Sequence, residues 1–286
     1  MLNFPIDLKS IINSNDYFAL KVVMEKVVEI ANLAAQQIID VYLDDDFDVQ
    51  IKNDKSPVTQ ADLLAHDLIV EQLKALSGDT PVVSEEDTSD LWHQRKDWPL
   101  YWLIDPLDGT KEFVDKNGEF TVNIALVSQG HPIMGIVQAP VLDTVYFAAK
   151  NIGAFKTISS NATSSIKVRD IPLIDDKQLF TVAIGRGCIP DKVKQLYQAL
   201  PSHNTIRIGS ALKTCLIAEG LADIYPRYGK TSEWDTAAAQ CILECAGGVV
   251  CDMQLNTLTY NTKDSLINPE FIAYGDKSID WSNYLD

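Results

Sequence analysis

The segment WLIDPLDGTKEF, from Trp102 to Phe113, most narrows what this chain can fold into. A short apolar run, typical of a buried strand, leads directly into Asp105 and Asp108. Asp-Pro and Asp-Gly are common turn pairs, and Asp108 can also cap a helix that starts at Gly109. A turn explains one of the two carboxylates and leaves the other without a structural reason. We therefore expect this strand to end in a functional site.

The same change from apolar to acidic residues occurs at two other places. Two valines lead into Glu85 in the stretch VVSEED, and Asp235 lies in the first turn of a helix predicted to open at Glu233. Helical spacing places Asp235 at the edge of the buried face of that helix. Ser232 and Asp235 also have capping-box spacing, so helix capping is the alternative explanation for Asp235.

The cost of bringing these carboxylates together indicates a bound cation. Two carboxylates about 4 Å apart repel by about 4 kcal/mol at an effective dielectric constant of about 20. A cation removes that repulsion, and carboxylate and carbonyl oxygens are ligands for magnesium or calcium. The next residues, Gly109, Thr110 and Lys111, would form a helix N-terminus, where free backbone amides favour an anion. A metal site beside a phosphate site predicts metal-assisted phosphoryl chemistry, and the P-loop signature is absent.

Composition limits the partners of this site. The chain has 286 residues, of which 40 are acidic and 24 basic, so a general affinity for nucleic acids or anionic membranes is not expected. A small anionic substrate would need local cations. The five cysteines are an odd number without a C-x-x-C pair, which favours buried reduced thiols over disulfides or a zinc site. No apolar stretch is long enough to span a membrane, and MLNFPIDLKS does not resemble a signal peptide.

The first half of the chain reads as α+β. Amphipathic helices are predicted over Asp16–Tyr42 and from about Thr59 to Leu76. Five short apolar segments with turns between them follow, and they predict strands of an antiparallel meander in which SQGHP is a hairpin loop. These segments are Val82–Val83, Tyr101–Ile104, Phe120–Val127, Ile133–Gln138 and Val145–Ala148.

The second half alternates between strand and helix patterns, which is typical of an α/β arrangement. The polar segment Ser159–Ser165 marks the expected junction. We predict an α+β lobe with the metal-binding motifs over residues 1–158, and an α/β lobe over residues 159–286 that completes the metal site and the substrate pocket. The predicted strands are Phe180–Ile184, Ile206–Ile208, Ala222–Tyr225 and Val249–Cys251, and the predicted helices follow Asp191, Gly209 and Ser232.

Three motifs in this order and spacing resemble one enzyme family. DPLDGTKEF, preceded by SEED and followed at a distance by WDTAA, is similar to the lithium-sensitive, magnesium-dependent phosphatases of the inositol monophosphatase family. The resemblance extends over nearly the whole chain, from the first long helix to INPEF. It implies a layered α/β/α/β/α sandwich, made of an α+β lobe and an α/β lobe. It also implies hydrolysis of a phosphate monoester with two or three Mg²⁺ ions.

The resemblance further implies roles for individual residues. Thr110 would orient the attacking water, with Asp62 accepting a hydrogen bond from Thr110. Lys213 has the alternative of being a solvated helix residue, and Arg227 that of a surface ion pair. The metal ligands would be Glu85, Asp105, Asp108 and Asp235 through their carboxylates, and Leu107 through its backbone carbonyl. The substrate contacts would be Glu85, Leu107, Asp108, Gly109, Thr110, Lys111, Ser210, Lys213, Arg227 and Asp235.

Within the family, Lys111-Glu112-Phe113 is similar to the adenosine 3',5'-bisphosphate nucleotidases, which release the 3'-phosphate and leave AMP. Inositol-specific members more often have Thr-Asn at positions 111 and 112. These nucleotidases usually carry Ser-Arg-Ser-His where this chain has Gly185-Arg186-Gly187-Cys188. An inositol monophosphatase or a broader sugar phosphatase is therefore the alternative, and a non-catalytic cation- or phosphate-binding protein is a third hypothesis.

The expected partner is a small bisphosphate nucleotide. Binding of nucleic acid and a transmembrane segment are not expected. The expected state is a monomer or a homodimer. The expected location is the cytoplasm, with peripheral attachment to the cytoplasmic face of the inner membrane as the alternative.

Overall fold

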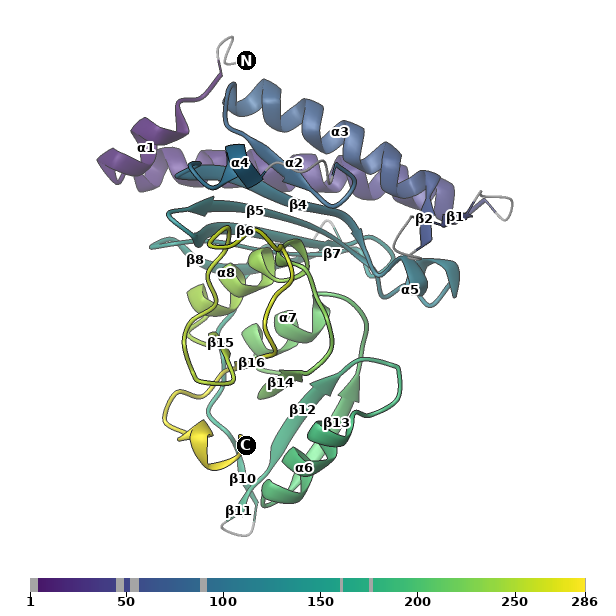
Figure 1. Cartoon of the computed structure of the whole chain (residues 1–286), viewed down its shortest axis with the longest axis vertical. Coiled ribbons are helices and arrows are strands. Elements are labelled where there is room, and N and C mark those ends of the chain that lie inside the picture. The colour runs from purple at the N-terminus through teal and green to yellow at the C-terminus, as the bar shows by residue number, and fades with distance from the viewer. Residues whose placement is uncertain are drawn as a thin grey trace.

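A computed structural model describes residues 5–44, 49–51, 57–87, 92–159, 162–174 and 177–285. These residues form five layers in the order helix, sheet, helix, sheet, helix (Figure 1). The layered sandwich expected from the sequence is therefore confirmed. The helices of the layers are α1 (Leu8–Ser14), α2 (Tyr17–Tyr42) and α3 (Gln60–Ser77) outside the first sheet, α7 (Leu212–Ala218) and α8 (Ala237–Cys245) between the sheets, and α6 (Asp191–Ala199) outside the second sheet.

The first sheet has seven strands in chain order. The meander is confirmed from β4 to β7, and it continues into β8 and β9, which the sequence pattern did not reveal. The prediction was wrong for β3, which pairs with β4 in parallel, because the chain crosses back to the starting end of β3 before it enters β4 at Leu100. The strands are β3 (Val82–Ser84), β4 (Leu100–Asp108), β5 (Thr121–Ser128), β6 (His131–Ala139), β7 (Thr144–Ala149), β8 (Gly153–Ile158) and β9 (Ser164–Ser165).

Strand β4 is buried on both faces, which explains its continuous apolar run. Trp102 and Ile104 pack on the helices of the outer layer, whereas Tyr101 and Leu103 belong to the core between the two sheets. Alternating side chains of one strand therefore enter different cores. The outer helices follow the sequence prediction closely. Asp16 is the N-cap of α2 and accepts a hydrogen bond from the backbone N of Ala19 at 2.9 Å.

The second sheet has the order β13-β12-β14-β16-β15. Strand β12 is parallel to both of its neighbours, and β16 is antiparallel to β14 and β15. The alternating pattern predicted β12 at its observed bounds. Strand β13 begins three residues before its predicted start and β14 two residues after its own, and β16 was not predicted. The strands are β12 (Phe180–Ile184), β13 (His203–Arg207), β14 (Ile224–Arg227), β15 (Val249–Asp252) and β16 (Phe271–Tyr274).

Short elements complete the described part of the chain. Two of them are small two-stranded sheets, and three are short helices or turns of helix. They are β1 (Val49–Ile51) with β2 (Pro57–Thr59), β10 (Leu173–Ile174) with β11 (Lys177–Gln178), α4 (Trp92–Arg95), α5 (Thr110–Val114) and the C-terminal 3-10 turn η2 (Trp281–Asn283).

The layers meet most closely where β6 faces α8. A Cβ atom added to Gly135 in β6 would lie only 2.2 Å from the backbone oxygen of Ala238 in α8. No side chain fits there, so the strand and the helix are in direct backbone contact. The middle layer is thereby fixed against the first sheet, close to the turn that carries Asp235.

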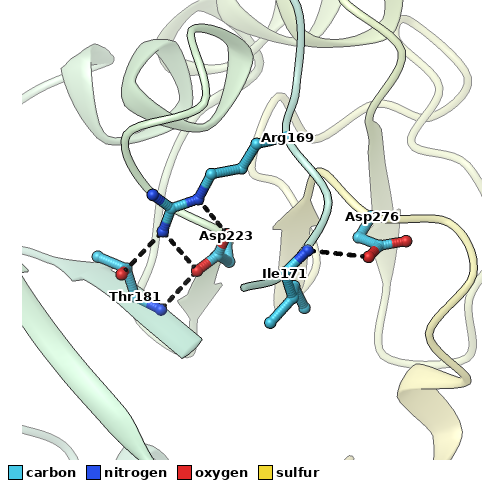
Figure 2. Close-up of polar contacts among 5 residues, drawn as sticks. All are labelled: Arg169, Ile171, Thr181, Asp223 and Asp276. Atoms are coloured by element: carbon cyan, nitrogen blue, oxygen red, sulfur yellow. Dashed lines mark hydrogen bonds and ion pairs between the residues drawn. The ribbon is translucent and has the colours of Figure 1, made fainter. Parts of the chain in front are cut away.

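An ion pair with a buried carboxylate holds the segment that leads from the first sheet to the second (Figure 2). The Asp223 carboxylate, with 1% of its surface exposed, accepts from Nε and Nη2 of Arg169, each at 2.9 Å. It also accepts from the backbone N of Thr181 at 2.6 Å. Nearby, the backbone N of Ile171 donates to Asp276 at 3.1 Å. These contacts fix the chain just before it enters β12.

The predicted junction lies where the chain leaves the first sheet. Ser164 and Ser165 still pair with β8 as strand β9, and residues 160–161 lie outside the described residues. The division into residues 1–158 and 159–286 stays a prediction. Of the cysteines, Cys188 is exposed because it follows β12 in a loop, so the expectation of uniformly buried thiols was wrong for that residue. Among the described helices, none combines the length and apolar character of a membrane span.

Candidate active site

Carboxylates from three separate elements converge at one edge of the first sheet. Ligand oxygens of Glu85, Asp105 and Asp235 all lie within 4.8 Å of one another. The parallel pairing of β3 and β4 explains the first two, because Ser84 pairs with Ile104 and both strands deliver their next residue to the same edge. The backbone N of Glu85 donates to Ile104 O at 3.2 Å, which fixes this arrangement.

Asp235 reaches the cluster from the middle layer. The expected continuous helix is interrupted here: Glu233–Asp235 is a 3-10 turn, η1, and α8 starts only at Ala237. Asp235 also closes the predicted capping box, since the backbone N of Ser232 donates to its Oδ2 at 2.8 Å. Capping and membership of the acidic cluster are therefore not alternatives, because the side chain does both.

Asp108 is the fourth predicted carboxylate, and it lies after an irregularity in β4. The pairing register with β5 shifts between Asp105 and Asp108, so the two side chains are not related by simple alternation. Asn123 in β5 donates to Asp108 Oδ2 at 3.4 Å. The intervening Leu107 is buried, and its backbone N donates to Asp105 Oδ1 at 3.0 Å.

The electrostatics of the cluster match a cation site. Burial, then the neighbouring Glu85, Asp108 and Asp235, raise the pKa of Asp105 well above its usual value. Burial and Asp108 raise the pKa of Asp235 to about 8. Burial also raises the pKa of Asp108, despite the opposing effect of Lys213. A divalent cation would relieve this repulsion, and oxygen-only donors fit Mg²⁺.

Thr110 and Asp62 form the predicted second part of the site. Thr110 Oγ1 donates to Asp62 Oδ1 at 3.4 Å. The other oxygen of Asp62 accepts from the backbone N of Thr59 at 2.7 Å and from Thr59 Oγ1 at 2.6 Å, which closes the capping box of α3. Asp62 is buried with these partners, so the Thr110 hydroxyl is oriented by a fixed carboxylate.

A cleft of about 290 Å³ opens beside the acids. Its lining combines acidic residues with several cationic side chains from both halves of the chain. The expected substrate residues that line it are Asp108, Gly109, Lys111, Ser210, Lys213, Arg227 and Asp235. Glu85, Leu107 and Thr110 are not among the residues that line this cleft: Glu85 follows β3, Leu107 lies in β4 and Thr110 is the first residue of α5.

Lys213 is not the solvated helix residue that the alternative supposed. Only 7% of its surface is exposed, and its Nζ donates to Ser210 O at 2.5 Å. Burial lowers the pKa of Lys213 to about 8, although Asp108 opposes that shift. Arg227 donates from Nη2 to Lys230 O at 2.8 Å, and its Nε is buried without a hydrogen-bond partner among the described residues. Both cations therefore face the cleft at a cost in desolvation that an anion would offset.

Two site residues escaped the sequence analysis. Asn123 lies opposite Asp105 in the sheet and contacts Asp108, and a polar residue in the apolar run TVNIALV was a usable signal. Glu119 contacts Arg186 and Gly209, which both line the cleft. No local pattern marks Glu119, because its partners come from loops far away in the sequence.

The fold and the acidic cluster define the class of protein. The chain belongs to the inositol monophosphatase family, whose model matches residues 20–278. Among curated relatives, the 3'(2'),5'-bisphosphate nucleotidase CysQ of Salmonella typhimurium is 46% identical over 251 residues, which cover 87% of this chain and 98% of the relative. CysQ of Haemophilus influenzae is 38% identical and covers 82% and 86% of the two chains.

A solved structure agrees with these relatives. The crystal structure of CysQ from Bacteroides thetaiotaomicron is 35% identical, with a TM-score of 0.76, and covers 89% of this chain and 97% of that one. The resemblance predicted from the three motifs is therefore confirmed.

Proposed function

We propose that this chain is a metal-dependent 3'(2'),5'-bisphosphate nucleotidase that removes the 3'-phosphate of adenosine 3',5'-bisphosphate to give AMP and phosphate. The observation that carries the proposal is the convergence of Glu85, Asp105 and Asp235 beside a cleft lined by cationic side chains, of which Lys213 is buried. High identity to the CysQ relatives over most of both chains supports the same substrate.

The acidic cluster is the proposed magnesium site. Glu85, Asp105, Asp108 and Asp235 would hold two or three Mg²⁺ ions through their carboxylates, together with the backbone carbonyl of Leu107. Bound there, the ions would neutralise phosphate charge and favour ionisation of the attacking water.

The chain's own residues orient the water. Because the Thr110 hydroxyl proton is directed to Asp62, the lone pairs of Thr110 Oγ1 remain available to accept a hydrogen bond from that water. Asp62 is itself fixed by Thr59, so the direction of this hydrogen bond is set before substrate arrives. The two residues thus position the nucleophile for in-line attack and need no covalent intermediate.

The cationic side chains explain how a protein of net charge −16 binds a bisphosphate. Gly109 and Thr110 are the proposed contacts of the phosphate that leaves, through their backbone. Lys111, Lys213 and Arg227 would contact the rest of the nucleotide, with Ser210 beside them. Lys213 and Arg227 both oppose the raised pKa of Asp108, and Arg227 also opposes that of Asp235, as cations next to the acidic cluster would do.

One observation keeps the alternative of an inositol monophosphatase or a broader sugar phosphatase. At Gly185 and Gly187, an added Cβ would meet no atom within 4 Å, so this wall of the cleft is open where nucleotidases carry serines. The open space would allow a substrate other than the nucleotide, such as a sugar or inositol phosphate, to lie against this wall. The choice between monomer and homodimer stays a prediction, as does a cytoplasmic location with or without peripheral attachment to the inner membrane.

The test is phosphate release with Mg²⁺ from adenosine 3',5'-bisphosphate and inositol 1-phosphate in parallel. We expect a strong preference for the nucleotide and no release after chelation of the metal. Preference for inositol phosphate would agree with the proposed metal site and would refute the proposed nucleotide substrate. Release from neither compound, by protein that is folded and supplied with Mg²⁺, would refute the proposed activity and favour a binding protein.

A further inference from the structure

One carboxylate joins three segments, two of which carry residues that line the cleft. Glu119 lies between α5 and β5, on the side of the first sheet. Its carboxylate accepts from Arg186 Nε at 2.6 Å and from Arg186 Nη2, and also from the backbone N of Gly209 at 2.9 Å. Arg186 and Gly209 belong to loops that follow the parallel strands β12 and β13. A single side chain therefore ties both of these loops to the sheet that carries the acidic cluster.

The backbone of Glu119 makes a second connection to the same loop. Ser210 Oγ lies 2.7 Å from Glu119 O and 2.8 Å from Asp108 O. A hydroxyl has one proton, so it donates to one of these carbonyls at a time and can exchange between them. Ser210 O in turn accepts from Lys213 Nζ. The position of a buried cation of the cleft thus depends on the loop that Glu119 holds.

Two glycines allow this close approach. A Cβ on Gly209 would lie 2.6 Å from Glu119 O, and a Cβ on Gly109 would lie 2.3 Å from Ser210 Oγ. Gly109 also has a φ of +92°, in the left-handed region that favours glycine. Each side of the contact contributes one glycine: Gly209 lets the loop approach the backbone of Glu119, and Gly109 leaves room for the Ser210 hydroxyl.

The loop of Arg186 is supported from its other side. Arg207 Nη1 donates to Gly187 O at 2.9 Å. The Arg186 side chain is half exposed, whereas only 14% of the Glu119 side chain is exposed. The acceptor is thus fixed and mostly shielded from water, while the donor lies at the surface of the cleft that it lines.

We propose that Glu119 is a positioning residue that latches the Gly185–Gly187 and Gly209–Ser210 loops onto the metal-carrying edge of the first sheet. It aligns Ser210, Lys213 and Arg186 with the acidic cluster without touching the reacting atoms. The proposal deepens the proposed nucleotidase function and rests on it.

The first test is a double-mutant cycle. Glu119→Gln and Arg186→Gln should each lower kcat/KM for adenosine 3',5'-bisphosphate about tenfold, chiefly through KM, because the substrate cations lose their alignment. The double variant should lose little more than either single variant, because both changes break the same latch. Additive losses would mean that the two residues act separately, and would overturn the proposal. Lys192→Gln is the matched control, since it breaks the exposed Lys192–Glu270 pair, neither member of which lines the cleft, and should change neither constant.

The second test needs no substrate, so it distinguishes failure of the latch from failure of the proposed function. Hydrogen exchange at the backbone amides of Gly209 and Ser210 should be faster in Glu119→Gln than in the wild type, and unchanged in the Lys192→Gln control. Unchanged exchange would overturn the latch whatever the kinetics show. Faster exchange with unaltered kcat and KM would also overturn it, because the loops would then have no effect on the site.

Discussion

The Thr110 hydroxyl lies 3.4 Å from a carboxylate, that of Asp62, which also closes the capping box of a long helix. One oxygen of Asp62 serves the proposed chemistry and the other serves α3. The proposed orientation of the attacking water is therefore tied to the start of α3, a helix that packs on the outer face of the first sheet. This double use makes separate predictions for activity and stability.

Asp62→Asn should lower kcat by about 10² to 10⁴, because an amide cannot accept from both threonines as the carboxylate does. The free energy of unfolding should fall by about 1 kcal/mol through the weakened cap. Steady-state phosphate release and urea unfolding measure the two effects. Thr59→Ala is the matched control, since it should weaken the cap and retain most of kcat. A large loss of kcat in Thr59→Ala would contradict a specific role for the Asp62–Thr110 contact.

Asp108→Asn should abolish turnover and leave the fold intact. The change removes one ligand charge, and the remaining acids then attract Mg²⁺ less strongly. It also removes repulsion, so the melting temperature of the metal-free protein should not fall. Phosphate release over a range of Mg²⁺ concentrations and thermal melting with a chelator measure these effects. Turnover near that of the wild type would refute the metal assignment.

Lys111→Thr tests the origin of nucleotide preference. Lys111 lines the cleft beside the acids, so its charge should matter more for a bisphosphate than for a monophosphate. We expect kcat/KM to fall more with adenosine 3',5'-bisphosphate than with inositol 1-phosphate. Equal losses with both substrates would remove Lys111 from the specificity of the enzyme.

Glu233 predicts a pH-dependent stability. It is fully buried, Oε2 accepts from Asn261 N at 2.9 Å, and Oε1 has no hydrogen-bond partner among the described residues. Burial raises its pKa from 4.5 to about 7, so the folded protein prefers the protonated acid. The stability that protonation provides is complete below the unfolded pKa and is lost as the pH rises through the folded pKa.

Glu233→Gln should therefore stabilise the protein more at high pH than at low pH. The gain in the free energy of unfolding should grow by about 2 kcal/mol between about pH 5.5 and about pH 8. Urea unfolding of the metal-free protein at both pH values measures it. Glu25→Gln is the control, because Glu25 is exposed on α2 and should show no such growth. A pH-independent difference would mean that Glu233 is ionised in the fold throughout.

The sequence revealed those parts of the site that depend on local pattern. The apolar run before Asp105 and the valines before Glu85 predicted strands that end in acids, and the parallel pairing of β3 and β4 brings those ends together. The capping-box spacing of Ser232 and Asp235 was also readable. In each case, a few neighbouring residues determine the local geometry.

Features that depend on tertiary contact were not readable. Strand β16 is short, and only its two antiparallel neighbours make it a strand of the second sheet. The Asp105–Asp108 register shift depends on pairing with β5, and the partners of Glu119 come from two distant loops. Exposure of Cys188 likewise follows from the path of its loop. The residue pattern within one segment does not determine which distant segments it will contact.

The backbone contact between Gly135 and Ala238 has a consequence for interpreting variants of this enzyme. Ala238 lies three residues beyond Asp235, so a methyl group at position 135 would push this member of the acidic cluster away from Glu85 and Asp105. From its position in β6, such a replacement would be classified as a packing defect of the core, outside the active site. Under the magnesium role proposed for the acidic cluster, its first effect would instead be a higher magnesium requirement in a protein that still folds. Activity assays of variants at several magnesium concentrations would therefore reveal replacements that appear inactive when only one concentration is used.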